Sequence, residues 1–204
     1  MENFILLAYE FFTTVFPIFI VMGIIYQYDH KKHIKINLWD FFYLCVFAVY
    51  IFGVFHFTGV GTIFDIKQYG LEPNINFVPF FHTDIDFVEW GLNILLFIPF
   101  GFLISMIQNN FSKIKYVCIS GFALSLLIEI SQLFNHRATD IHDLIFNTLG
   151  ALCGFILFQL YTRFSKRTIT IHLQHAIFIY ILMMFFCRFF LFHELGMAAR
   201  LFHF

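Results

Sequence analysis

Residues 88–107 read VEWGLNILLFIPFGFLISMI, and this stretch decides the class of fold. Its one charged residue, Glu89, lies near the start, and after it only Asn93 and Ser105 carry amide or hydroxyl side chains. An α-helix needs about 20 predominantly apolar residues to cross the hydrocarbon core of a bilayer. The stretch therefore predicts a transmembrane helix.

The composition of the whole chain agrees with a membrane protein. The chain has 204 residues, about the size of one domain, of which 60% are hydrophobic and 12% charged. Soluble domains carry about 25% charged residues, so this chain has too few charges to cover a globule with polar surface. Its formal net charge of −1 offers no basic field to a phosphate backbone, which excludes nucleic acid as a partner.

Similar apolar runs recur along the chain. They predict an all-α, polytopic integral membrane helix bundle with about six transmembrane helices. We expect residues 1–204 to form a single membrane domain. The runs cover roughly residues 4–28, 39–61, 88–107, 116–134, 142–162 and 174–192.

The four cysteines indicate neither a disulfide framework nor a metal site. Each lies in a different apolar run, and no Cys-x-x-Cys or Cys/His ligand spacing is present. We therefore expect no bound metal and no cofactor. The cysteines are Cys45, Cys118, Cys153 and Cys187.

Lys and Arg residues concentrate in alternate loops between the predicted spans. Loops rich in these residues face the cytoplasm by the positive-inside rule. Loops 29–38, 108–115 and 163–173 are then cytoplasmic, and both chain termini are extracellular. The cytoplasmic set is Lys31, Lys32, Lys35, Lys113, Lys115, Arg163, Lys166 and Arg167, whereas the remaining loops and termini hold Lys67, Arg137 and Arg200.

Three of the predicted helices place a polar side chain at a similar depth below the outer surface. Glu129 lies about six residues before the outer end of its helix, or roughly 9 Å at 1.5 Å per residue. By the same rise, Asn93 and Asn147 lie on the order of 8–10 Å deep. Because polar groups in a span normally face protein or a water-filled cavity, we expect a polar pocket that opens outward. The candidate ligand-binding residues are Glu89, Asn93, Glu129, Gln132, Arg137, Asp140, Asp143 and Asn147.

Several of these candidates also have a purely structural interpretation. Asp140 has the position of a helix N-cap, and Asn147 would serve equally well as a hydrogen bond between two helices. Gly150 and Gly154 have the spacing of close helix packing. Arg137 would form either a salt bridge over Glu129 or a fork for an anionic headgroup, and the spacing leaves both open.

Two segments resemble the signatures of the VanZ-like family. The first reads EWGLNILLFIPFG from Glu89 to Gly101 and contains the Asn, Phe, Pro and Gly of that family's first signature. The resemblance covers residues from about 39 to 160 and leaves additional spans at about 4–28 and 174–192. The second segment follows the pattern E..Q, then R..D..D...N..G...G, at Glu129, Gln132, Arg137, Asp140, Asp143, Asn147, Gly150 and Gly154.

The resemblance implies a multi-pass protein of the bacterial cytoplasmic membrane. The family's namesake is an accessory protein of glycopeptide-resistance clusters and is associated with resistance to teicoplanin, an acylated glycopeptide that acts at the outer face of that membrane. No reaction and no cofactor comes with the family, so no catalytic residue is assigned. We expect a non-enzymatic protein whose outward pocket binds, or shields against, an amphiphilic membrane lipid or lipoglycopeptide.

Two other classes of function stay open at this point. A membrane enzyme acting on a lipid-linked cell-envelope precursor would use Glu129 as a general base, with Asp140, His142 and Asp143 around a divalent cation. No GxSxG or HExxH motif supports this alternative. A transporter would use Glu10, Glu129 and Arg188 as its intramembrane charges.

Overall fold

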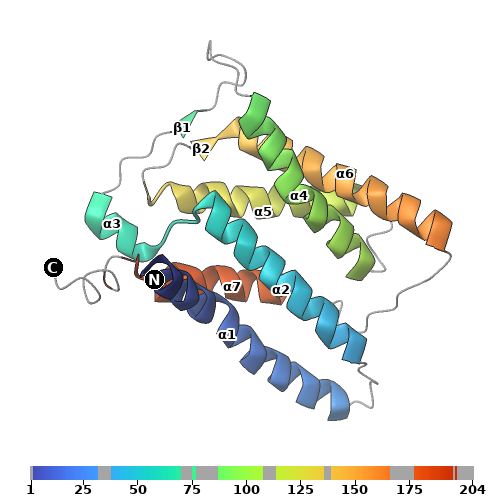
Figure 1. Cartoon of the computed structure of the whole chain (residues 1–204), viewed down its shortest axis with the longest axis horizontal. Coiled ribbons are helices and arrows are strands. Elements are labelled where there is room, and N and C mark those ends of the chain that lie inside the picture. The colour runs from blue at the N-terminus through green and yellow to red at the C-terminus, as the bar shows by residue number, and fades with distance from the viewer. Residues whose placement is uncertain are drawn as a thin grey trace. The chain divides into compact units, whose positions relative to one another are not determined.

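The structure of the chain is a computed structural model (Figure 1). It describes residues 2–31, 38–69, 75–76, 87–107, 114–135, 139–165, 177–194 and 196. Most of these residues are helical, because a helix satisfies every backbone N–H and C=O within its own segment and so tolerates a surrounding without water. The helices are α1 (Glu2–Lys31), α2 (Leu38–Thr58), α3 (Ile63–Tyr69), α4 (Phe87–Ile107), α5 (Ile114–Gln132), α6 (Ile141–Ser165) and α7 (Ile177–Leu191).

The predicted class, an all-α polytopic membrane protein, is confirmed. Within the described ranges, five helices are long and apolar enough to cross a membrane, namely α1, α2, α4, α5 and α6. The sixth predicted span corresponds to α7, which is apolar but has only 15 residues. Part of that predicted span, residues 174–176, lies outside the described residues.

The contacts between residues divide the chain into two compact units. Unit 1 comprises residues 1–70 and 175–204, and unit 2 comprises residues 71–174. Unit 1 therefore holds α1, α2, α3 and α7, and unit 2 holds α4, α5 and α6 together with two short strands. The additional N-terminal and C-terminal helices predicted from the sequence belong to the same unit.

A buried ion pair joins α1 and α7 within unit 1. Arg188 is 5% exposed and Glu10 is 3% exposed. The Arg188 Nη2 and Nε atoms donate to Glu10 Oε1 at 2.7 and 3.1 Å. His56 Nδ1 lies 2.7 Å from the other carboxylate oxygen, so α2 also contacts the pair. The sequence identified Glu10 and Arg188 as intramembrane charges without predicting that they meet.

The end of α2 supplies one more acceptor to this ion pair. Gly59 has φ of 63°, which places it in the left-handed region after the last helical residue. The N–H groups of Gly59 and Val60 donate to the carbonyls of His56 and Phe55 in the Schellman arrangement. The chain leaves the helix with the Val60 carbonyl directed at Arg188, whose Nη1 donates to it.

Helices α4 and α6 of unit 2 run parallel and in close contact along a glycine seam. A Cβ added at Gly150 would lie 2.4 Å from the Ile94 carbonyl oxygen, and one added at Gly154 would lie 2.0 Å from that of Ile98. Gly101 of α4 approaches the Ala151 backbone equally closely. The predicted close packing at Gly150 and Gly154 is confirmed, and its partner is α4.

Helix α5 packs antiparallel against α6. Gly121 lies against Ala151. One turn further along α5, Ser125 accepts a hydrogen bond from Asn147. The two-residue strands β1 (Ile75–Asn76) and β2 (Thr139–Asp140) pair in parallel just before α6 begins, and they lie at the end of the unit where α4 starts (Figure 1).

Candidate functional site

The directions of the three helices in unit 2 bring the predicted polar residues to one end. Because α4 and α6 run parallel and α5 runs antiparallel to them, the starts of α4 and α6 lie beside the end of α5. Five of the eight predicted site residues meet there. We call them the polar cluster: Asn93, Glu129, Asp140, Asp143 and Asn147.

Glu129 is the most deeply buried acid of the polar cluster, with 1% of its surface exposed. Its Oε2 accepts a hydrogen bond of 3.1 Å from the backbone N–H of Asp140. Its carboxyl group also lies within hydrogen-bonding reach of the Asp143 carboxyl. Two carboxyl groups this close hold a proton or a cation between them, or they repel each other.

Asn93 connects α4 to this pair of acids. Its side-chain amide donates to Asp143 Oδ1 at 2.5 Å. Glu89 lies one turn earlier on α4 and is exposed, and its charge acts on Asp143. The start of α4 therefore contributes one hydrogen-bond donor and one further negative charge.

Asn147 lies one turn deeper than Asp143 on α6 and is 2% exposed. Its Nδ2 donates to Ser125 Oγ at 2.9 Å, so the predicted hydrogen bond between two helices is present. Its other polar atom, Oδ1, is buried and has no hydrogen-bond partner among the described residues. A buried acceptor without a donor costs about 1–3 kcal/mol, so this oxygen is unfavourable for the fold unless another group donates to it.

Asp140 caps α6, as its position in the sequence predicted. Its Oδ1 accepts a hydrogen bond of 2.9 Å from the backbone N–H of His142, which satisfies one of the free donors at the helix start. The same oxygen lies 2.7 Å from Nδ1 of the His142 ring. Asp140 is thus both the N-cap of α6 and a member of the polar cluster.

An aromatic stack lies beside the polar cluster. The Trp90 ring is stacked on Phe146 at 4.7 Å and on His142 at 5.5 Å between ring centres. Neither Trp90 nor Phe146 is among the site residues predicted from the sequence. The sequence spacing could have identified Trp90 as a site residue. It lies three residues before Asn93, and residues three apart share one side of a helix.

Three predicted site residues are not part of the polar cluster, namely Gln132, Arg137 and the exposed Glu89. Gln132 is buried on α5 one turn beyond Glu129, at 5% exposure. Arg137 lies outside the described residues. Its two predicted roles, a salt bridge with Glu129 or the binding of an anionic headgroup, therefore stay predictions.

The polar cluster does not have the geometry of a metal site. Among the described residues, no group of three or more His, Cys, Asp and Glu side chains is arranged to hold a metal ion. The arrangement of a divalent cation with Asp140, His142 and Asp143, which the enzyme alternative requires, therefore receives no support from this geometry.

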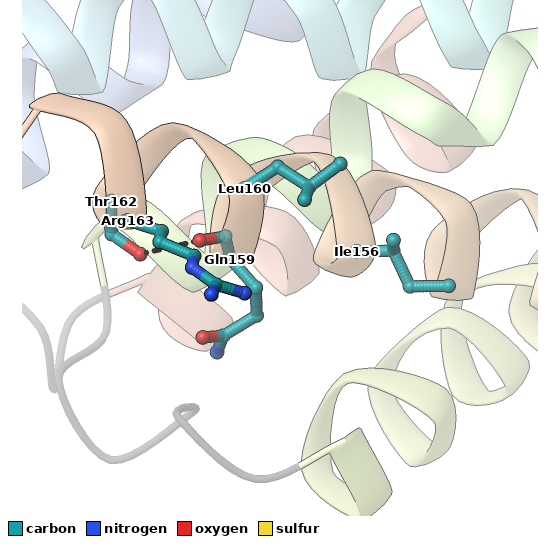
Figure 2. A pocket seen from close by; sticks show the side chains of 5 residues that line it. All are labelled: Ile156, Gln159, Leu160, Thr162 and Arg163. Atoms are coloured by element: carbon teal, nitrogen blue, oxygen red, sulfur yellow. Dashed lines mark hydrogen bonds between the residues drawn. The ribbon is translucent and has the colours of Figure 1, made fainter.

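A shallow hollow of about 430 Å³ lies at the other end of α6, away from the polar cluster (Figure 2). All of its lining residues come from this one helix, and Figure 2 shows the Thr162 hydroxyl donating to the Gln159 carbonyl within it. It contains one charged group and an open apolar surface, so it offers few groups that could bind a ligand specifically. Its lining residues are Ile156, Gln159, Leu160, Thr162 and Arg163.

Comparison with known proteins agrees with the two sequence signatures. A model of the VanZ/LLP1 family matches residues 41–163, more than half of the chain. "Protein VanZ" of Enterococcus faecium is 39% identical over 92 residues, which cover 44% of this chain and 55% of that protein, so the match spans about half the relative's length. No solved structure matches the chain. The chain belongs to the VanZ/LLP1 family.

Proposed function

We propose that this chain is a non-enzymatic membrane protein whose polar cluster binds, or shields against, an amphiphilic lipid or lipoglycopeptide at the outer face of the membrane. The observation that carries the proposal is the convergence of α4, α5 and α6 on five polar side chains at one end of unit 2. Polar groups at membrane depth are costly unless they have a partner, and they typically mark a functional site.

The surface around the polar cluster suits an amphiphile. Leu92, next to Asn93 in sequence, is 60% exposed, and Leu95 is 63% exposed. Ile145 and Leu149 of α6 are also exposed, at 37% and 41%. In a bilayer such side chains face acyl chains, so a headgroup in the polar cluster would leave its tail in apolar surroundings.

The orientation of the polar cluster rests on the distribution of charge. The acids gather where α4 and α6 begin, whereas Lys115 lies at the start of α5 and Arg163 at the end of α6. By the positive-inside rule the basic end is cytoplasmic, and this supports a polar cluster in the outer leaflet and termini outside the cell. An outward site matches the location of cell-envelope lipids and of acylated glycopeptides.

The similarity to Protein VanZ supports a role in resistance to teicoplanin-type lipoglycopeptides. Such compounds combine a polar peptide core with an acyl chain. This combination matches a polar cluster bordered by exposed leucine and isoleucine side chains. The resistance role rests on the resemblance and on this physical match.

Susceptibility of cells tests the proposal. A sensitive Gram-positive host would express the wild-type chain, the Asn93→Ala and Glu129→Gln variants, and Gln159→Ala as a control in the remote hollow. The wild type and the control should raise the inhibitory concentration of an acylated glycopeptide but not of its deacylated form. The two cluster variants should lose this protection at equal expression. Unchanged susceptibility with the wild type, or equal protection by all variants, would contradict the proposal.

A further inference from the structure

Three oxygen acceptors, two of them on buried residues and one on the half-buried Asp143, lie where α5 meets α6. They are the carboxyl groups of Glu129 and Asp143, which lie within hydrogen-bonding reach of each other, and Oδ1 of Asn147. The Asn147 oxygen has no hydrogen-bond partner among the described residues although the side chain is 98% covered. This oxygen is evidence for a missing donor that is independent of the acids.

The geometry of the helices directs the Glu129 carboxyl and the Asn147 amide toward each other. Side chains on a helix lean toward its N-terminus, so Asn147 leans toward the turn that holds Asp143. Glu129 leans in the same way toward the turn of Ser125 on α5. Because α5 and α6 are antiparallel and Asn147 donates to Ser125 Oγ, the Glu129 carboxyl and the Asn147 amide approach the same space between the helices.

The charge around this space is negative. Glu89 and Asp140 both act electrostatically on Asp143, in addition to Glu129. Asn93 donates its amide hydrogen to Asp143, and the His142 ring is engaged by Asp140. Lys115 and Arg163 lie toward the opposite ends of α5 and α6. The arrangement therefore favours a cation over an anionic headgroup.

We propose that the side chains of Glu129, Asp143 and Asn147 together bind the primary ammonium group of an amphiphile. This inference rests on the proposed function and narrows its ligand class. A primary ammonium has three N–H donors, and the site offers one acceptor to each. The Glu129–Asp143 carboxyl pair and an amide oxygen supply charge and hydrogen bonds together, and hydrogen bonds of this charge-assisted kind are about twice as strong as neutral ones.

The neighbouring aromatic rings strengthen the preference for an organic cation. Trp90, Phe146 and His142 form a stack beside the acids, and aromatic faces attract ammonium groups at distances up to about 6 Å. A divalent metal is disfavoured, because the described residues hold no group of three acid, His or Cys side chains in ligand geometry. A trimethylated ammonium has no N–H donor and would leave Asn147 Oδ1 unsatisfied.

Tryptophan fluorescence provides a direct probe of this site. The chain has two tryptophans, so Trp39→Phe leaves Trp90 as the single reporter next to the polar cluster. The full-length protein in mild detergent would be titrated with dodecylamine, dodecyltrimethylammonium and dodecanol. Short-chain phosphatidylethanolamine and phosphatidylcholine then distinguish a lipid headgroup from a simple alkylamine. Saturable changes are expected with dodecylamine and not with the trimethylated or alcohol analogue.

Variants identify the acceptors. Asn147→Leu and Glu129→Gln should weaken dodecylamine binding by on the order of tenfold or more, since each removes a hydrogen bond to a charged group. Thr148→Val is the matched control. Thr148 lies next to Asn147 on α6, and its hydroxyl donates a hydrogen bond to the Leu144 carbonyl of the same helix. Size-exclusion profiles would show that each variant is folded.

The outcomes separate this inference from the function on which it rests. Saturable binding of dodecanol as tight as that of dodecylamine, or equal binding of the trimethylated analogue, would overturn the ammonium site while leaving an amphiphile-binding protein. The absence of saturable binding for every amphiphile would overturn both proposals.

Discussion

The side-chain amide of Asn93 donates to Asp143 Oδ1 at 2.5 Å, across the interface between α4 and α6. On α6, Asp143 lies about two turns before Gly150, where the glycine seam formed by Gly150 and Gly154 begins. The same pair of helices therefore carries both a packing contact and a polar contact, and the two types of contact have different consequences when they are removed.

Replacing Asn93 by Ala should leave a folded protein. The change removes one hydrogen bond and one polar group from membrane depth, and we expect a loss of about 1 kcal/mol in the free energy of unfolding. Thermal unfolding in detergent measures this loss. If Asn93→Ala lowers the yield of folded protein as strongly as a substitution in the glycine seam, Asn93 is a structural bond and does not belong to the ligand site.

Replacing Gly150 by Ala should disrupt the packing of α4 against α6. The new Cβ would lie 2.4 Å from the Ile94 carbonyl oxygen, which belongs to the backbone and cannot move alone. Gly91→Ala on α4 is the control, because a Cβ there meets nothing within 4 Å. We expect a clear fall in unfolding temperature for Gly150→Ala and none for Gly91→Ala. Equal unfolding temperatures would show that the close approach at Gly150 is absent.

The ion pair of unit 1 predicts strong coupling between Glu10 and Arg188. Removing one partner leaves a buried charge without its counter-charge and should cost about 3–5 kcal/mol. Replacing both, as in Glu10→Leu with Arg188→Met, should cost much less than the two single losses added together. A double-mutant cycle read by thermal unfolding checks this expectation. Additive losses would mean that the two side chains do not meet.

The predicted topology places Lys32 inside the cell and Asn135 outside. In a variant whose native cysteines are replaced by serine, a single cysteine at each position would be labelled on intact cells with a membrane-impermeant maleimide. Modification is expected at position 135 and not at position 32 until the cells are permeabilised. The reverse pattern would place the polar cluster on the cytoplasmic side and remove the basis for an outward site.

The helices could be predicted from the sequence, because they depend on local composition. Runs of apolar residues locate the spans, and counting residues from the span ends places Asn93, Glu129 and Asn147 at one depth. The signature glycines predicted close packing without naming α4 as the partner. The structure adds that Gly150 and Gly154 lie against Ile94 and Ile98.

Which helices pack against each other could not be predicted from the sequence. In a membrane the lipid-facing and protein-facing sides of a helix are equally apolar, so hydrophobic periodicity does not reveal which side packs. Glu10 and Arg188 are 178 positions apart, and only the packing of α1 against α7 makes them partners. The stacking of Trp90 on Phe146 and His142 likewise depends on the side-by-side placement of α4 and α6.

Binding of an acylated glycopeptide to the purified protein in lipid nanodiscs tests the proposed function most directly. A teicoplanin-type compound and its deacylated form would be titrated against the wild type, Glu129→Gln, Asn93→Ala and the control Gln159→Ala, with empty nanodiscs to measure partition into lipid. We expect saturable binding of the acylated compound to the wild type and the control, and at least about tenfold weaker binding to both cluster variants. Binding that equals partition into empty nanodiscs, or that is unchanged in Glu129→Gln and Asn93→Ala, would contradict the assignment of this function to the polar cluster.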